Sequence, residues 1–180
     1  MKKIGLAAAA AIVGLAASLA PATFAATLAT GTMTVEATVE ASCALAVNNL
    51  NFGTYKATDA SDREVSTSFN LKCSEGVAPK VAIQQGKSFD TATGVRTLTR
   101  EDATDTLEYV LYRPTATTAN AACGSFSSST PNVWGFGEQS FTPTDVTLAG
   151  GSYNICGYMQ KGQNKPAGRY VDTVTVNVDF

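Results

Sequence analysis

Apolar and polar residues alternate along two stretches of this 180-residue chain, residues 32–39 and 170–180. A period of two is typical of a β-strand with one buried face, because successive side chains of a strand point to opposite sides. On the first stretch the apolar face consists of Met33, Val35, Ala37 and Val39. On the second stretch it includes Val174, Val176, Val178 and Phe180. The pattern predicts an amphipathic strand at each position.

Further short runs of β-branched and aromatic residues lie between these stretches, separated by Gly, Pro, Asn and Asp. The additional runs expected to be strands are 65–73, 80–84, 107–112 and 153–159. Residues 115–131 are rich in Thr, Ala, Ser and Asn and are expected to form a long loop. Several short strands with regular turns predict an all-β domain, an antiparallel sandwich.

The first 25 residues have a different character. Lys2 and Lys3 precede an apolar, Ala-rich run from Ile4 to Leu19, and small residues follow as far as Ala25. This is the pattern of a secretory signal peptide, so we expect residues 1–25 to be removed. A membrane anchor is disfavoured because the apolar run is short for a membrane span. The remaining 155 of 180 residues suit one domain.

Export would bring the four cysteines into an oxidising compartment, where disulfides are the default. The cysteines are Cys43, Cys73, Cys123 and Cys156. Four cysteines allow three pairings, and their spacing leaves the choice open. Sequential pairing would join residues 30 and 33 positions apart. A zinc site of four thiolates is disfavoured because the chain has no Cys-x-x-Cys pair.

Composition limits the functions that the chain can have. It carries 13 basic and 15 acidic residues, a net charge of −2, and no histidine. A nucleic-acid partner is not expected, because binding phosphates requires a basic face. The absence of histidine excludes Ser-His-Asp and Cys-His catalysis, and no Gly-x-Ser-x-Gly motif occurs. We therefore expect no catalytic site, no metal and no cofactor, and a secreted hydrolase is a remote alternative.

The two alternating stretches raise a question of pairing. The second ends at Phe180, so an apolar strand edge would have no following strand to cover it. The first follows small residues from Ala26 onward and is a strand without an evident neighbour. The two could pair within one molecule. Between molecules, the same pairing would build a head-to-tail polymer.

The order of motifs along the chain resembles that of the spore coat protein U domain family, which includes the subunits of archaic (Csu-type) chaperone–usher pili. The matching stretches are Leu50-Asn51-Phe52-Gly53-Thr54-Tyr55, residues 94–98, residues 107–112, Trp134-Gly135, and residues 157–180 with their Gly-Arg-Tyr-Val-Asp-Thr-Val core. The ordered set is more specific than any one motif. Cys156 stands where many members have another residue, which suggests a second disulfide, with Cys123, particular to a subgroup.

The resemblance implies an incomplete immunoglobulin-like antiparallel β-sandwich, residues 41–180, that lacks its last strand. In this family a periplasmic chaperone lends a strand, and at an outer-membrane usher the N-terminal extension of the next subunit replaces it. Residues 26–40 would be this donor-strand extension, and Met33, Val35, Ala37 and Val39 would be the side chains it inserts. Val174, Val176, Val178 and Phe180 would line one wall of the acceptor groove.

The resemblance also implies partners and a location. The partners would be further copies of the chain in a head-to-tail fibre, the chaperone, the usher, and tip or minor pilins. The fibre would be an extracellular pilus of a Gram-negative bacterium that supports adhesion and biofilm formation. The alternative is a monomeric secreted module that closes its own sheet with residues 32–39 and binds carbohydrate or another surface.

Overall fold

The computed structural model describes residues 28–126 and 132–180. The signal peptide predicted for residues 1–25 lies outside this part. The chain divides into two units, residues 1–38 and 39–180, which are described separately. Residues 28–38, the described part of the first unit, form neither strand nor helix, and their side chains are exposed. The strand expected at residues 32–39 is thus not formed, because a lone segment has no neighbouring strand to accept its ladder of hydrogen bonds.

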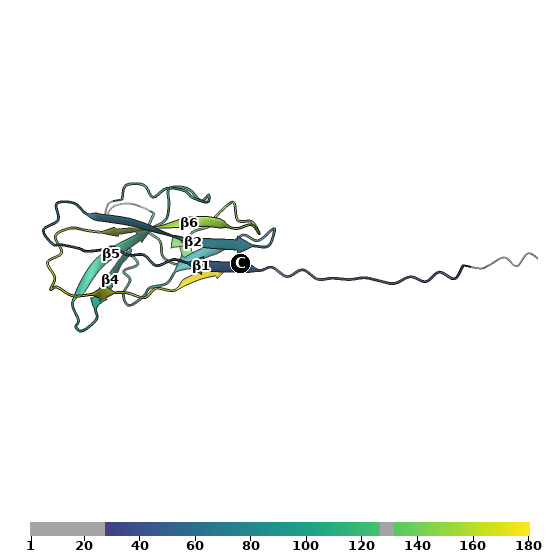
Figure 1. The fold of residues 1–180 in the computed structure, drawn as a ribbon, viewed down its shortest axis with the longest axis horizontal. Coiled ribbons are helices and arrows are strands. Elements are labelled where there is room, and N and C mark those ends of the chain that lie inside the picture. The colour runs from purple at the N-terminus through teal and green to yellow at the C-terminus, as the bar shows by residue number, and fades with distance from the viewer. Residues whose placement is uncertain (1–27, 127–131) are drawn as a thin grey trace, which may run out of the picture. The chain divides into compact units, whose positions relative to one another are not determined.

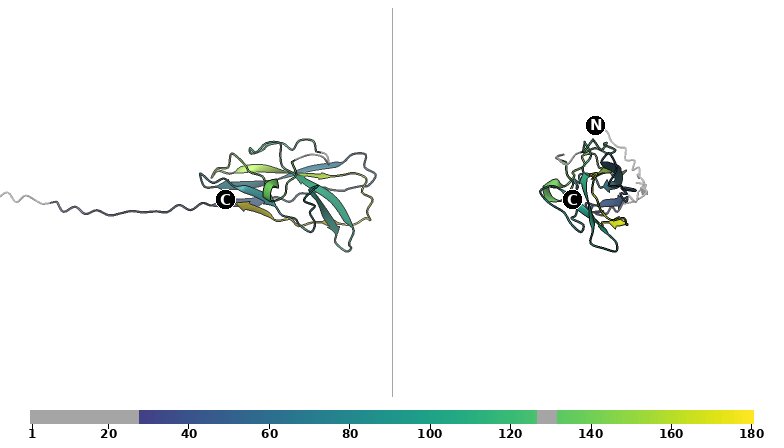
Figure 2. Two further views of the ribbon diagram at one scale, coloured as in Figure 1. Left: turned by 180° about the vertical axis from the view of Figure 1, so that it is seen from behind. Right: turned by 90° about the vertical axis from the view of Figure 1, so that its left-hand side faces the viewer.

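The second unit is an antiparallel β-structure (Figure 1). Its strands are β1 (Cys43–Val47), β2 (Arg63–Cys73), β3 (Lys80–Ile83), β4 (Val95–Arg100), β5 (Thr106–Tyr112), β6 (Gly151–Met159), β7 (Tyr170–Val171) and β8 (Val176–Asp179). The described residues add one short 3₁₀ helix, η1 (Gly137–Gln139), and contain no α-helix (Figure 2). In these residues no helix has the length and apolar character that crossing a membrane requires.

Four of the expected strands are confirmed as β2, β3, β5 and β6. The stretch 170–180 is divided into β7 and β8, because β7 pairs with β4 whereas β8 pairs with β3 in another sheet. β1 and β4 were not expected from the pattern. In β4 the reason is clear, since a charged residue, Arg96, occupies the most buried position of the strand.

Two sheets enclose the core. One has the order β1-β2-β6-β5-β4-β7 and the other is the pair β3-β8. The core side chains come from both sheets and include Phe69, Leu71, Ile155, Val81 and Ile83. Trp134 is fully buried between them and donates its indole N–H to the carbonyl of Val81 at 3.0 Å. This arrangement confirms the predicted all-β fold, an immunoglobulin-like antiparallel sandwich.

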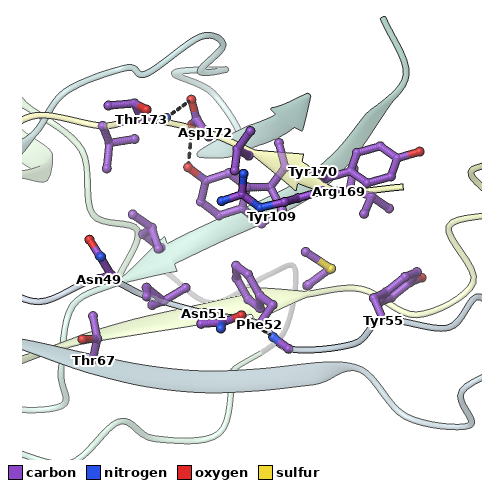
Figure 3. Close-up of a pocket in the computed structure, with 18 of the residues that line it drawn as sticks. Asn49, Asn51, Phe52, Tyr55, Thr67, Tyr109, Arg169, Tyr170, Asp172 and Thr173 are labelled. Carbon is purple, nitrogen blue, oxygen red and sulfur yellow. Dashed lines mark hydrogen bonds between the residues drawn. The ribbon is translucent and has the colours of Figure 1, made fainter. Parts of the chain in front are cut away.

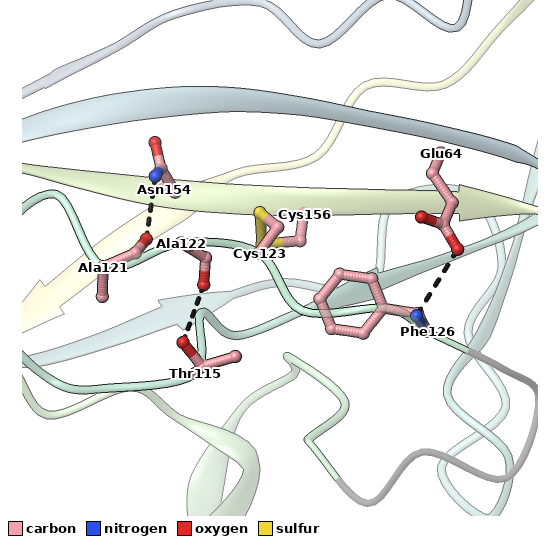
Figure 4. Close-up of a disulfide and its surroundings, with 8 residues drawn as sticks. All are labelled: Glu64, Thr115, Ala121, Ala122, Cys123, Phe126, Asn154 and Cys156. Carbon is pink, nitrogen blue, oxygen red and sulfur yellow. Dashed lines mark hydrogen bonds between the residues drawn. A yellow bond between two sulfur atoms is a disulfide. The ribbon is translucent and has the colours of Figure 1, made fainter.

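A second apolar cluster covers the outer side of β5 and β6, and Figure 4 shows three of its members, Cys123, Phe126 and Cys156. There the Phe126 ring stacks on Tyr112 with 4.7 Å between ring centroids. The loop that carries Phe126 is attached to β6 by the disulfide between Cys123 and Cys156. The other disulfide, between Cys43 and Cys73, joins the facing ends of β1 and β2. The cysteines are therefore paired sequentially, and both faces of β6 are covered.

Replacing Cys123 and Cys156 together with serine should lower the free energy of unfolding by about 2–4 kcal/mol. The bond spans 33 residues, and opening a loop of that length restores conformational freedom to the unfolded chain. Urea unfolding followed by the fluorescence of Trp134, the single tryptophan, measures the change. The double serine variant of Cys43 and Cys73, whose loop spans 30 residues, is the size-matched comparison. An unchanged urea midpoint for the first variant would contradict a stabilising role of the loop tether.

Candidate strand-acceptor groove

A groove of about 1020 Å³ lies in the domain formed by residues 39–180 (Figure 3). Most of its lining comes from residues 47–55, from residues 165–174 with Val176, and from side chains of β4, β5 and β6. The core side chains exposed to the groove include Leu98, Leu107, Leu111, Ile155 and Met159. The groove therefore gives access to the same apolar core that holds the two sheets together.

The groove lies where the two sheets end without meeting. Among the described residues β1 pairs with β2 alone, and β8 pairs with β3 alone. Each is consequently an edge strand whose outer N–H and C=O groups have no ladder partner. β7 is likewise an edge strand, because within the described part of the chain it pairs with β4 alone. An extended segment placed between residues 47–55 and 170–176 would lie beside β7, reach the ends of β1 and β8 at Val47 and Val176, and cover the core side chains below.

The segment after β1 is shaped by the Leu50–Tyr55 motif. Gly53 has φ +71°, a conformation that glycine adopts readily, and its N–H donates to the Asn51 side chain at 2.8 Å. This turn directs Phe52 into the core, where its ring meets Tyr109 edge-on at 5.8 Å between centroids. The Tyr55 hydroxyl accepts from the Gln163 N–H at 2.7 Å. One wall of the groove is thus fixed by local turn chemistry.

A polar pair interrupts the apolar lining. Tyr109 donates its hydroxyl proton to a carboxylate oxygen of Asp172 at 2.7 Å, and the backbone N–H of Lys87 donates to the other oxygen at 3.1 Å. Burial, together with the hydrogen bond to Asp172, holds the pKa of Tyr109 far above its usual range. The phenol therefore stays protonated and keeps residue 172 attached to β5.

A buried cation lies beside this pair. Arg96 is fully buried and donates to the carbonyls of Ile83 at 3.0 Å and Trp134 at 3.2 Å, and also to that of Gln84. Its guanidinium carbon lies 4.5 Å from the centroid of the Phe89 ring. Burial lowers the pKa of Arg96, but an arginine remains charged in proteins. The residue has a structural role, since it joins β4 to the end of β3 across the two sheets.

The residues predicted for strand exchange occupy different surroundings. Val174 and Val176 line the groove, Val178 packs against the core outside its lining, and Phe180 is 60% exposed. Met33, Val35 and Val39 are 84%, 81% and 89% exposed, and Ala37 is exposed as well. The floor of the groove and the Tyr109–Asp172 pair were not identified from the sequence, because only the topology brings β5 beside residue 172.

Three tyrosines of the domain, Tyr55, Tyr109 and Tyr112, do not form a shared binding surface for a sugar. Tyr55 and Tyr109 line the groove, whereas Tyr112 packs on the outer cluster. Within residues 28–126 and 132–180 no group of three or more His, Cys, Asp or Glu side chains is placed to hold a metal ion. What the site offers chemically is an apolar floor between unpaired strand edges.

Comparison with known proteins agrees with this geometry. The family model for the Spore Coat Protein U domain matches residues 29–177. The chain is also similar to the crystal structure of the CsuC–CsuE chaperone–tip adhesion subunit pre-assembly complex from archaic chaperone–usher Csu pili of Acinetobacter baumannii. That match has a TM-score of 0.53 and 21% sequence identity, and it covers 79% of this chain and 41% of the other.

At 21% identity the structural match shows a shared fold, and the chain spans less than half of the matched chain. A search of curated proteins finds no match. The family model, however, covers most of the chain, including every strand from β1 to β7. The chain therefore belongs to the Spore Coat Protein U domain family.

Proposed function

We propose that this protein is a structural pilin subunit that polymerises by donor-strand complementation. Residues 26–40 of one copy lie in the groove of the next copy and complete its sandwich. The observation that carries this proposal is the groove itself, which gives access to core side chains between two unpaired strand edges. The described part of residues 26–40 supplies a matching apolar face, since Met33, Val35 and Val39 are almost fully exposed.

The free energy of burying apolar side chains favours this insertion. Burying one Val or Met side chain stabilises a complex by about 1.5–3 kcal/mol. Three such side chains in the groove would contribute several kcal/mol, and backbone hydrogen bonds to the two edges would add to this. The association is heterologous, so each copy that donates a strand still has a groove to be filled, and a fibre grows.

A subunit with an open groove needs a temporary cover before assembly. We infer that a periplasmic chaperone supplies a strand first and that an outer-membrane usher exchanges it for residues 26–40 of the next copy. Support comes from the matched crystal structure, which contains a chaperone with a tip adhesion subunit. The product would be a surface pilus, with tip or minor pilins at its end, that serves adhesion and biofilm formation without catalysis.

Surface material sheared from the native bacterium should contain multimers that resist SDS without heating. On a gel probed for this chain, the unboiled sample should give a ladder that collapses to one band on boiling. Deleting residues 26–39 should remove the ladder, because the strand that completes each sandwich is lost. Replacing residues 26–32 with Gly and Ser leaves the apolar face of residues 33–39 intact and should retain it.

The alternative function predicts the opposite pattern. A module that closes its own sheet with residues 32–39 would run as one monomer band with and without boiling. That result would contradict the pilin proposal and favour a secreted module that binds carbohydrate or another surface.

A further inference from the structure

We propose that the donor strand lies antiparallel to residues 170–176 in one register, with Ala37 of the incoming copy facing Asp172 and its Glu40 facing Arg169. This inference rests on the proposed function, because it assigns the occupant of the groove to residues 33–40 of a second copy. It goes further by naming the polar residues that select one alignment of the two strands.

The edge formed by residues 170–178 has one side that faces the core and one that faces solvent. Val174, Val176 and Val178 are half-buried, whereas Thr173, Thr175 and Asn177 are exposed. Even-numbered positions of this edge therefore face the core, and Tyr170 and Asp172 continue the series, since Tyr170 packs against the core and Asp172 binds Tyr109. In the donor the odd-numbered positions are apolar. Antiparallel neighbours share a face, so the donor must align odd positions with even ones.

Charge selects the direction of the donor. The charged residues of the groove lining are Lys165, Arg169 and Asp172, and both cations lie at the end far from β8 in sequence. Between residues 28 and 42 the chain has two charged residues, Glu36 and Glu40, near the end of the donor segment. An antiparallel donor brings Glu40 to the cationic end. A parallel donor would carry it toward Asp179, a like charge.

Side-chain size selects the register. The inward series of the edge has one charged member, Asp172, whose carboxylate accepts from Tyr109 and from the Lys87 backbone. The inward series of the donor has one small member, Ala37. A bulky apolar side chain on Asp172 would remove water from the carboxylate, which is unfavourable, whereas an alanine leaves room for solvent.

The two criteria agree on one alignment. With Ala37 facing Asp172, the remaining pairs are Met33–Val176, Val35–Val174, Val39–Tyr170 and Glu40–Arg169. A shift of one residue would turn the apolar face outward. A shift of two residues in either direction places Val35 or Val39 on Asp172 and moves Glu40 away from Arg169. Arg169 is exposed and already paired with Glu101, and its guanidinium has further N–H groups that can donate to a second carboxylate.

Cysteine cross-linking of the assembled pilin tests the register. The four native cysteines are paired with each other, so new thiols can be introduced at exposed positions. Thr34→Cys is combined in one chain with Thr175→Cys, its expected neighbour, or with Thr173→Cys or Asn177→Cys, which represent shifts of two residues. The first combination should give multimers that survive boiling and disappear on reduction, and the other two should give at least tenfold less of them.

The possible cross-linking results distinguish a wrong register from a failure of the polymerisation proposal. Boil-resistant multimers from the Thr173→Cys or Asn177→Cys combination instead would overturn the register. An unboiled ladder without cross-links in any combination would overturn the antiparallel placement on this edge. A cross-link within a single monomer would show that the chain closes its own sheet, in which case the proposed function itself fails.

A charge exchange tests the second contact independently. Glu40→Arg places like charges beside Arg169 and should make the unboiled multimers dissociate about two- to fivefold faster, the range of an exposed ion pair. Adding Arg169→Glu together with Glu101→Arg, which reverses the existing Arg169–Glu101 pair as well, should restore the original rate. Unchanged dissociation in Glu40→Arg, or no recovery in this triple variant, would overturn the Glu40–Arg169 contact.

Discussion

Replacing Val35 with Asp should abolish the heat-sensitive multimers. In the proposed register this side chain lies against Val174 over the apolar floor of the groove. A carboxylate placed there without a partner costs several kcal/mol, which exceeds what one valine contributes. The loss should be complete on an unboiled gel of sheared surface material, because each junction in the fibre carries the same defect.

The control for this variant is Thr34→Asp. Thr34 precedes Val35 on the opposite face of the donor segment, so the same charge added there remains in water and the ladder should persist. Both variants leave residues 39–180 unchanged, so the folding of the domain does not enter the comparison. An intact ladder from Val35→Asp would show that the odd-numbered face does not enter the groove.

The periodic parts of the fold could be predicted from the sequence. In β2 apolar residues alternate with polar ones, and β5 and β6 contain short apolar runs, so the burial of these strands shows in the pattern. β4 was missed because its most buried side chain is an arginine. A cation is buried there because three carbonyls converge on its position, those of Ile83, Gln84 and Trp134. Such convergence depends on the tertiary fold.

The groove illustrates the same limit. Val174 and Val176 could be assigned to one wall from their alternation, because a period of two reports which side chains share a face. The opposite wall comes from residues 47–55, more than one hundred positions earlier in the chain, and the floor comes from β4, β5 and β6. Alternation within one strand carries no information about which other strands lie across from it, so Tyr109 and Asp172 could not be paired in advance.

Replacing Arg96 with Leu should lower the free energy of unfolding by several kcal/mol, because each buried carbonyl left without its donor costs about 1–3 kcal/mol. The substitution leaves the carbonyls of Ile83, Gln84 and Trp134 without their donor in the core. It also removes the contact of the cation with the Phe89 ring. Urea unfolding of the purified protein by circular dichroism measures the change.

Two further variants serve as comparisons for Arg96→Leu. Arg113→Leu removes a half-buried arginine that donates to one carbonyl, that of Ser140 at 3.1 Å, and should cost about 1 kcal/mol. Arg96→Lys keeps the positive charge but lacks the planar fork that serves several carbonyls at once, so its stability should lie between those of the parent and Arg96→Leu. If Arg96→Leu were no less stable than Arg113→Leu, the guanidinium would not be what joins β4 to the end of β3. In that case the apolar contacts between the sheets would by themselves keep the floor of the groove in place.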